Sequence, residues 1–361
     1  MDSRLLATLN AQASNATDPV VWARAVCRAA SHFARHGQTK DALISIGVVR
    51  AQFGNELHHE VASWLMLAEG VLHYFQVQTR ESYDRIRRAY GLAVALKTVS
   101  ALPSCAAWMA HFEFNECMYD KMVIHLEEAL TLATADDHQA WARASLVMAD
   151  AYQVAGEYTL ARPWYDKVRI RAAAEGDNAT LSAMLYNVAA FRASNVRIAD
   201  TFGMEMAKEA HRASMETSSS YIYDYAIGTA SLDFLTQMLR GLMFTIEKKF
   251  VDALVMFEKV DLARVQKRML PTIYVDMGWC NANLGQSDAG WALAMLAADQ
   301  MSSLTEADDV AYVASRISEV AKICDQPEQA EVFKAKAELA LAEHRAFQKK
   351  LLSMLQKIRV N

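Results

Sequence analysis

The sequence predicts an all-α fold, in which about eight helix–turn–helix repeats stack into a solenoid and a long C-terminal helix follows. The first observation is a short residue pattern that returns about every 40 residues, because such self-similarity marks stacked helix pairs. The second is that the 361 residues include only 13 glycines and 5 prolines, which lie at predicted helix ends. The third is that no stretch shows the sustained apolar–polar alternation of a strand.

The recurring pattern begins at the turn between two helices. A turn residue is followed five positions later by a small residue, and then by apolar residues four and seven positions further on. The clearest copy has Gly156 as the turn residue, followed by Ala161, Tyr165 and Val168. The other turn residues are Gly37, Val77, Cys117, Asn195, Lys248, Gly285 and Asp325, of which Val77 and Asn195 anchor the weakest copies. Successive turns therefore lie 37–40 residues apart, with one exception.

The exception is the interval of 53 residues between Asn195 and Lys248. It contains three consecutive serines and the segment 221–225, which is rich in tyrosine. We expect an extended loop or a longer helix here, and residues 210–230 are a candidate hinge.

Two copies of the pattern, at 148–168 and 240–257, resemble the tetratricopeptide-repeat family. In that family a small residue on the first helix packs against a small residue on the second. The resemblance assigns these roles to Ala149 with Ala161, and to Gly241 with Ala253. The family repeat is usually 34 residues, so this chain is more similar to the longer-repeat variants of bacterial regulators. The resemblance implies a right-handed superhelix that binds other molecules.

The charge and cysteine content exclude several classes of function. The formal net charge is −5, and no stripe of Lys and Arg crosses the repeats, so we expect no nucleic-acid partner. The N-terminus lacks the apolar core of a signal peptide, and no apolar run reaches membrane-spanning length. The five cysteines are scattered through apolar helical segments, which indicates reduced core residues of a cytoplasmic protein.

The sequence contains no recognisable active site. His32 and His36 are one helical turn apart, but the glutamate of the metalloprotease pattern is missing after His32. Glu56 and His59 form a Glu-x-x-His spacing, but a di-iron bundle needs a second such motif. His111, Glu113 and Glu116 are interleaved with aromatic residues, and we expect them to face a groove or solvent. We therefore expect no catalytic residues, no metal site and no cofactor, and we expect the protein not to be an enzyme.

The first helix of each repeat lines the concave face of such a stack, so its polar and aromatic side chains are candidates for partner binding. These groove candidates are Arg143, Asp150, Gln153, Tyr186, Asn187, Arg192, Tyr274, Asp276 and Asn281.

The C-terminal segment predicts a long helix, since neither Gly nor Pro occurs after Pro327. We divide the chain into a solenoid over 1–338 and a C-terminal helix over 339–361. The apolar positions Phe347, Leu351, Leu355 and Ile358 must be buried against something. Two alternatives are open: the helix caps the solenoid, or it forms the seam of a homodimer or couples to a partner.

The sequence predicts a non-enzymatic scaffold of bacterial cytoplasmic regulation or signalling, which binds a protein or peptide in the concave groove. The alternative is a ligand-responsive regulator, whose superhelix binds a small peptide or metabolite and couples through the C-terminal helix to an output partner. The 18 methionines are either adaptable lining of a pocket or core gap-fillers. A dry pocket lined by Met and Tyr would favour the regulator, and a long, open, polar groove would favour the scaffold.

Overall fold

The computed structural model describes residues 3–54, 58–77, 80–229 and 233–359. Within these ranges the chain forms seventeen α-helices and two short 3-10 helices, η1 (Lys267–Met269) and η2 (Met301–Ser303), and no strand. The predicted all-α fold is confirmed. None of these helices is both long enough and apolar enough to cross a membrane.

The chain divides into two compact units. The first unit comprises Met1–Met184, Tyr223–Leu232 and Leu351–Asn361, and the second comprises Leu185–Ile222 and Asp233–Lys350. The boundary that we expected at residue 338 lies within one continuous helix, α17 (Pro327–Leu355). The division into a solenoid and a C-terminal helix stays a prediction.

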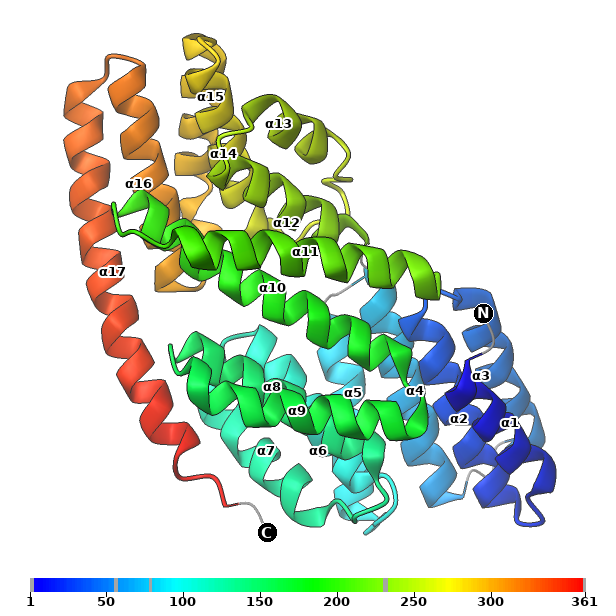
Figure 1. The fold of residues 1–361 in the computed structure, drawn as a ribbon. Coiled ribbons are helices and arrows are strands. Elements are labelled where there is room, and N and C mark those ends of the chain that lie inside the picture. The colour runs from blue at the N-terminus through cyan, green and yellow to red at the C-terminus, as the bar shows by residue number, and fades with distance from the viewer. Residues whose placement is uncertain (1–2, 55–57, 78–79, 230–232, 360–361) are drawn as a thin grey trace. The chain divides into compact units, whose positions relative to one another are not determined.

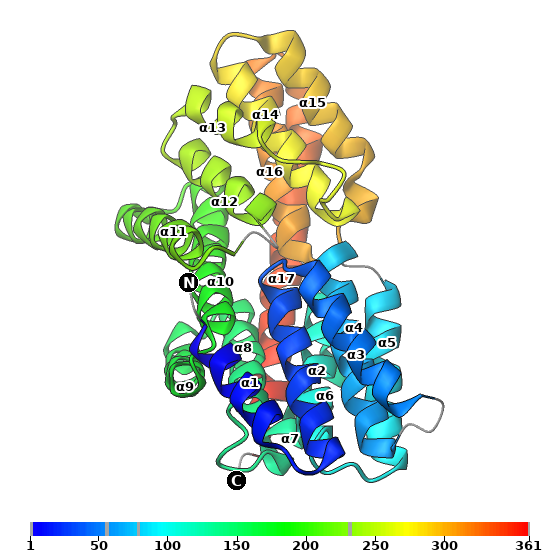
Figure 2. The same ribbon diagram turned by 90° about the vertical axis from the view of Figure 1, so that its right-hand side faces the viewer.

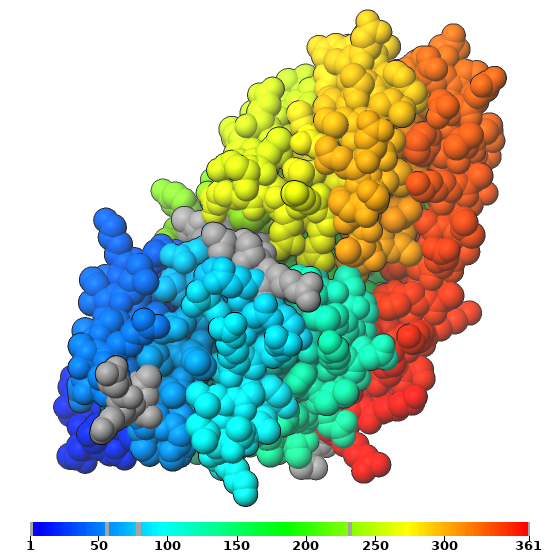
Figure 3. All heavy atoms as spheres, turned by 180° about the vertical axis from the view of Figure 1, so that it is seen from behind, coloured from blue at the N-terminus to red at the C-terminus, as the bar shows by residue number. Residues whose placement is uncertain are grey.

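The first unit is a series of helix pairs, in which the second helix of each pair packs on the first (Figure 1). In addition, α2 packs on α4, α5 on α6, and α6 on α8. In the space-filling view the atoms of α3 to α5, blue to cyan, form one continuous surface (Figure 3). The helices of this unit are α1 (Arg4–Asn15), α2 (Pro19–Arg35), α3 (Thr39–Phe53), α4 (His59–Val77), α5 (Arg80–Ala95), α6 (Leu102–Asn115), α7 (Tyr119–Leu132), α8 (His138–Val154) and α9 (Tyr158–Glu175).

The second unit repeats this arrangement with later helix pairs (Figure 2). Here α12 packs on α13, α14 on α15, and α14 also on α16. Its helices are α12 (Asp233–Ile246), α13 (Phe250–Glu258), α14 (Leu270–Asn283), α15 (Ser287–Asp299) and α16 (Ala307–Ile323), and it shares α10 (Asn178–Thr201), α11 (Ala207–Ile227) and α17 with the first unit. This repeat-like stacking fits an α-solenoid in general, while the right-handed superhelix of eight repeats stays a prediction.

Six of the eight predicted turn residues adopt the left-handed backbone conformation that ends a helix sharply. They are Gly37, Cys117, Gly156, Lys248, Gly285 and Asp325, with φ between 54° and 79°. A residue with positive φ lets the next helix fold back on the one before it. The small residues that follow, such as Ala42, Ala161 and Ala253, are 0% exposed. The residue pattern therefore located these turns correctly.

The turn that we placed at Asn195 is wrong. Asn195 lies inside α10, and the chain reverses instead near Gly203, where φ is 68°. The long interval is explained by a longer helix, since α11 continues to Ile227 and includes most of residues 210–230. Val77 is the last residue of α4, and the connection that follows it lies outside the described residues.

Helices α14 and α15 approach so closely that only glycine fits at their crossing. A Cβ atom added to Gly290 would lie 2.9 Å from the amide nitrogen of Ala282 and 2.9 Å from the carbonyl oxygen of Gly278. Both are backbone atoms, so no side chain can rotate away to make room.

Gly290→Ala is therefore expected to destabilise the protein by about 1–3 kcal/mol, because the two helices must separate. Helix propensity alone predicts the opposite sign, since Ala stabilises a helix interior by roughly 1 kcal/mol relative to Gly. The matched control is Gly47→Ala on α3, where an added Cβ meets no atom within 4 Å. The control should gain stability in urea denaturation. Equal gains for both variants would contradict this close packing.

Candidate functional site

A cavity of about 180 Å³ opens in the second unit, where five α-helices and the short helix η1 contribute to its wall. Most of its wall is apolar or aromatic, with two methionines, a tyrosine and a phenylalanine. Helix α10 supplies one side, α12 the second, and α14 with the short helix η1 the third, while α13 and α16 contribute one residue each. The lining residues are Tyr186, Ala190, Ser194, Arg197, Met238, Leu239, Leu242, Phe257, Met269, Thr272, Ile273, Asp276 and Asp309.

The charged side chains of this cavity are Arg197, Asp276 and Asp309. The Arg197 guanidinium forms an ion pair with Asp309 and lies 4.6 Å from the centre of the Tyr312 ring. Asp276 is 3% exposed, and its Oδ1 accepts a hydrogen bond from the Tyr312 hydroxyl. No hydrogen bond to Asp276 Oδ2 occurs within the described part of the chain. That oxygen remains an acceptor for a ligand.

Burial raises the pKa of Asp276 to about 6, although Arg316, Tyr312 and Arg197 oppose the shift. Burial and the Asp276 charge also raise the pKa of Tyr312 well above its usual value. The tyrosine therefore keeps its proton and remains a donor to Asp276 at neutral pH. The ionised form of such a buried carboxylate is stabilised by a cationic ligand or by a strong hydrogen-bond donor.

Arg316 is a second buried cation whose charge acts on Asp276. It is 0% exposed, and its guanidinium lies 4.0 Å from the centre of the Trp279 ring. Its nitrogens form ion pairs with Asp200 at 2.9 Å and with Glu319 at 2.6 Å. Arg316 is therefore already neutralised by two carboxylates, and Asp276 does not have to serve as its partner.

The structure brings two of the predicted groove candidates, Tyr186 and Asp276, into this one cavity. Arg192 is instead held in ion pairs with Glu209 and Glu216 on α11. The three remaining candidates of this unit are half-buried: Asn187 on α10, and Tyr274 and Asn281 on α14. Asn281 donates to the carbonyl of Met277 on its own helix, and Tyr274 packs against the core.

The groove candidates of the first unit lie on α8. Arg143 is buried against Trp108, and Asp150 accepts a 2.7 Å hydrogen bond from the Tyr165 hydroxyl. Gln153 is half-buried. Asp150 therefore contributes to the contact between α8 and α9.

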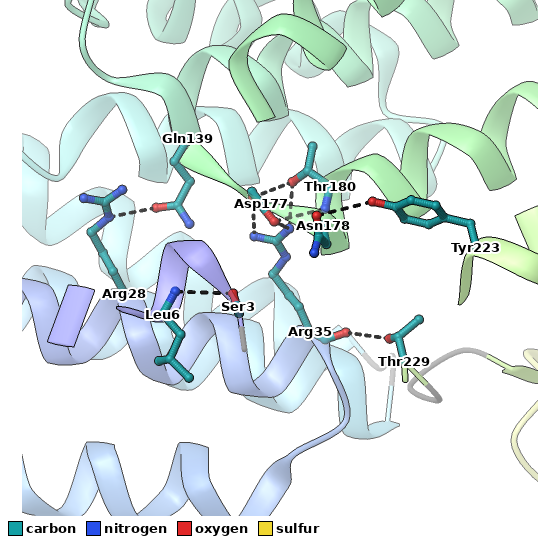
Figure 4. A network of polar contacts seen from close by, with 10 residues as sticks. All are labelled: Ser3, Leu6, Arg28, Arg35, Gln139, Asp177, Asn178, Thr180, Tyr223 and Thr229. Carbon is teal, nitrogen blue, oxygen red and sulfur yellow. Dashed lines mark hydrogen bonds and ion pairs between the residues drawn. The ribbon is translucent and has the colours of Figure 1, made fainter. Parts of the chain in front are cut away.

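No pattern in the sequence predicts the ion pair that joins α2 to the start of α10. Arg35 donates from both terminal nitrogens to Asp177, at 2.9 and 2.6 Å, and also to Thr180 Oγ1 at 2.7 Å (Figure 4). Asp177 in turn accepts from the Thr180 amide at 3.1 Å. Burial alone would raise the pKa of Asp177, but Arg35 and Thr180 hold it well below its usual range. This network has a structural role, since all of its charges are satisfied internally.

Burial lowers the pKa values of both His32 and His36. The rings of His32 and His36 lie 4.4 Å apart between centroids, and burial lowers the pKa of His32 to about 3. Glu113 is 0% exposed and binds His125 Nδ1 at 2.6 Å. Glu56 lies outside the described residues, among which no cluster of three or more His, Cys, Asp or Glu could hold a metal ion.

The predicted interface of the C-terminal helix is partly buried in the structure. Leu351 and Leu355 are 0% and 2% exposed. Phe347 and Ile358 are half-buried. The burial of the two leucines favours the capping alternative over a dimer seam, because these side chains have no surface left for a second copy.

The comparisons with protein-family models and with curated proteins found no match. The similarity to tetratricopeptide repeats therefore stays a prediction from the residue pattern.

Proposed function

We propose that the protein is a ligand-responsive regulator, which binds a small organic molecule in the cavity of its second unit. The observation that carries this proposal is the lining of that cavity, in which Tyr186, Met238 and Met269 surround an apolar space beside a buried carboxylate. Such apolar cavities with a few convergent polar groups are the usual form of small-molecule sites. This was the criterion that distinguishes the regulator from an open-groove scaffold.

The size and polarity of the cavity indicate the class of ligand. A dry apolar cavity of about 150 Å³ accommodates benzene, so the space here suits one ring with a short polar arm. The apolar wall would hold the ring, and Asp276 would accept hydrogen bonds from the arm. A primary ammonium suits this position, because Arg197 and Arg316 already have carboxylate partners, whereas Asp276 forms no ion pair within the described residues.

Binding would influence the conformation because the cavity joins separate helices. A ligand that contacts α10, α12 and α14 together stabilises one relative arrangement of these helices. The shift in the conformational equilibrium is limited by the difference in the ligand's affinity for the two arrangements. The proposed output is a changed affinity for a cytoplasmic partner protein.

Three probes with the same phenyl ring and propyl arm test the ligand class: 3-phenylpropylamine, 3-phenylpropan-1-ol and 3-phenylpropionate. We expect calorimetric titration to give the tightest binding for the amine and the weakest for the carboxylate. Ala190→Phe fills the cavity and should abolish binding, whereas Ala289→Phe, at an exposed position of α15, should bind normally. Equal binding of the amine to both variants would refute the assigned site.

The affinity for the amine should depend on pH. Since the pKa of Asp276 is about 6, the carboxylate is ionised above pH 6 and protonated below it. We therefore expect amine binding to weaken as the pH falls through 6, with about a tenfold loss per pH unit below that value. The neutral alcohol should show no such loss, and a parallel loss for both probes would exclude Asp276 as the cause.

The alternative is the peptide-binding scaffold. It predicts that none of the three probes binds and that a protein partner is retained by Ala190→Phe.

A further inference from the structure

The first unit contains a buried arginine that forms no ion pair within the described residues. Arg143, on α8, is 6% exposed, and its guanidinium carbon lies 4.2 Å from the centre of the Trp108 ring on α6. It forms no hydrogen bond or ion pair with any residue that the structure describes. Burying a cation without a paired anion is costly, so this arrangement needs an explanation.

The other buried arginines of this protein show what is missing. Arg35 is 4% exposed and binds Asp177 through two parallel hydrogen bonds. Arg316 is 0% exposed and binds both Asp200 and Glu319. Each of these guanidinium groups is neutralised by a carboxylate of the chain, and Arg143 is the exception within the described residues.

Aromatic rings surround Arg143, and the charges of Arg35, Asp177 and Asp150 act on it from further away. The ring of His111 lies 5.3 Å from that of Trp108, between centroids, and burial together with the Arg143 charge lowers the pKa of His111 well below its usual value. His111 therefore stays neutral and adds no competing charge. Tyr74 packs edge-on against Trp108, at 6.2 Å between ring centroids.

The guanidinium of Arg143 also remains accessible. Several polar atoms of this unit are fully enclosed and lack a partner, among them His32 Nδ1 and Ser145 Oγ, but no nitrogen of Arg143 belongs to that group. The small exposed part of this residue therefore includes donors that an incoming anion can reach.

We propose that Arg143 binds the carboxylate of a small organic acid, whose apolar part lies against Trp108 and Tyr74. The planar guanidinium matches a carboxylate through two parallel hydrogen bonds, as Arg35 matches Asp177 in the same unit. Asp150 and Asp177 lie close enough to influence the charge of Arg143 and to repel an incoming anion. A singly charged carboxylate is therefore favoured over a phosphate dianion, which these two groups repel more strongly. This site lies in the first unit and is independent of the cavity proposed above.

The test is the melting temperature of the full chain with benzoate, with its neutral analogue benzamide, and with inorganic phosphate, all at one ionic strength. We expect benzoate alone to raise the melting temperature of the wild type. Arg143→Met should melt higher than the wild type without a probe, because the unpaired charge is gone, and should not respond to benzoate. The control Arg162→Met, at an exposed position of α9, should respond as the wild type does.

Arg143→Lys retains the charge but loses the planar pair of donors, so we expect its affinity for benzoate to fall at least about tenfold. This variant also serves if Arg143→Met does not fold. The proposal is overturned if benzoate leaves the wild type unchanged, if Arg143→Met or Arg143→Lys binds benzoate as tightly as the wild type, or if phosphate binds more tightly than benzoate.

Discussion

Replacement of Asp177 by asparagine is expected to lower the free energy of unfolding by about 3–5 kcal/mol. The substitution leaves Arg35, which is 4% exposed, without its carboxylate. Asparagine can still accept the amide hydrogen bond of Thr180, so the start of α10 stays capped and the loss reports the charge alone. Urea denaturation at pH 7 measures it.

Two further variants separate the ion pair from other effects. The double variant Arg35→Met with Asp177→Asn should recover most of the loss, because no unpaired buried charge remains. Asp166→Asn removes the carboxylate of an exposed pair with Arg169, whose side chains are 52% and 64% exposed, and should change the stability by less than about 1 kcal/mol. A double variant as unstable as the single one would show that Arg35 matters through packing and not through charge.

The same ion pair determines a pH dependence. The pKa of Asp177 in the folded protein lies below its ordinary value of 3.8. A carboxyl group with a lowered folded pKa stabilises the protein above the unfolded pKa, and this contribution is lost as the pH falls below it. We expect wild-type stability to drop below about pH 4 and Asp177→Asn to lack this component.

Replacement of Asp276 by asparagine is expected to raise the free energy of unfolding, in contrast to Asp177→Asn. The folded pKa of Asp276 is raised from 3.8 to about 6, so the folded state binds the proton more tightly than the unfolded state does. Stability therefore falls as the pH rises from 3.8 to 6 and is constant above that range. Since asparagine is never ionised, Asp276→Asn should gain about 2–3 kcal/mol at pH 7.5 and less than about 1 kcal/mol at pH 4.

This gain is the expected signature of a carboxylate that is retained for binding at the expense of stability. The same variant should lose affinity for 3-phenylpropylamine, although it keeps an acceptor for the Tyr312 hydroxyl. A loss of stability at pH 7.5 would indicate that Asp276 serves mainly as a structural partner of Arg316, and the assigned binding role would be wrong.

The turns were the most predictable part of the fold. A left-handed residue followed by a small one five positions later is a local requirement, so the pattern located Gly156 and even the non-glycine turns at Lys248 and Asp325. The turn at Gly203 was missed because an even spacing was imposed on a region in which α10 and α11 are longer than their counterparts. The division into two units depends on contacts distant in sequence, which no periodicity reveals.

The candidate cavity was predictable only in part. Tyr186 and Asp276 were identified because they lie on the first helices of their pairs. Arg197 and Asp309 were not identified as candidates, since a charged side chain on a helix is usually exposed to solvent. Asp309 also lies in the first turn of α16, where an acidic residue is already favoured by the helix dipole. Only the packing of α10 against α16 distinguishes these two residues from ordinary surface charges.

The most direct test of the proposed function is native mass spectrometry of the protein purified without denaturation from its own source. We expect the wild type and Ala289→Phe to carry a small organic molecule, and Ala190→Phe, in which the cavity is filled, to have lost it. A protein partner retained by all three variants, with no small molecule in any of them, would contradict the ligand-responsive regulator and favour the scaffold.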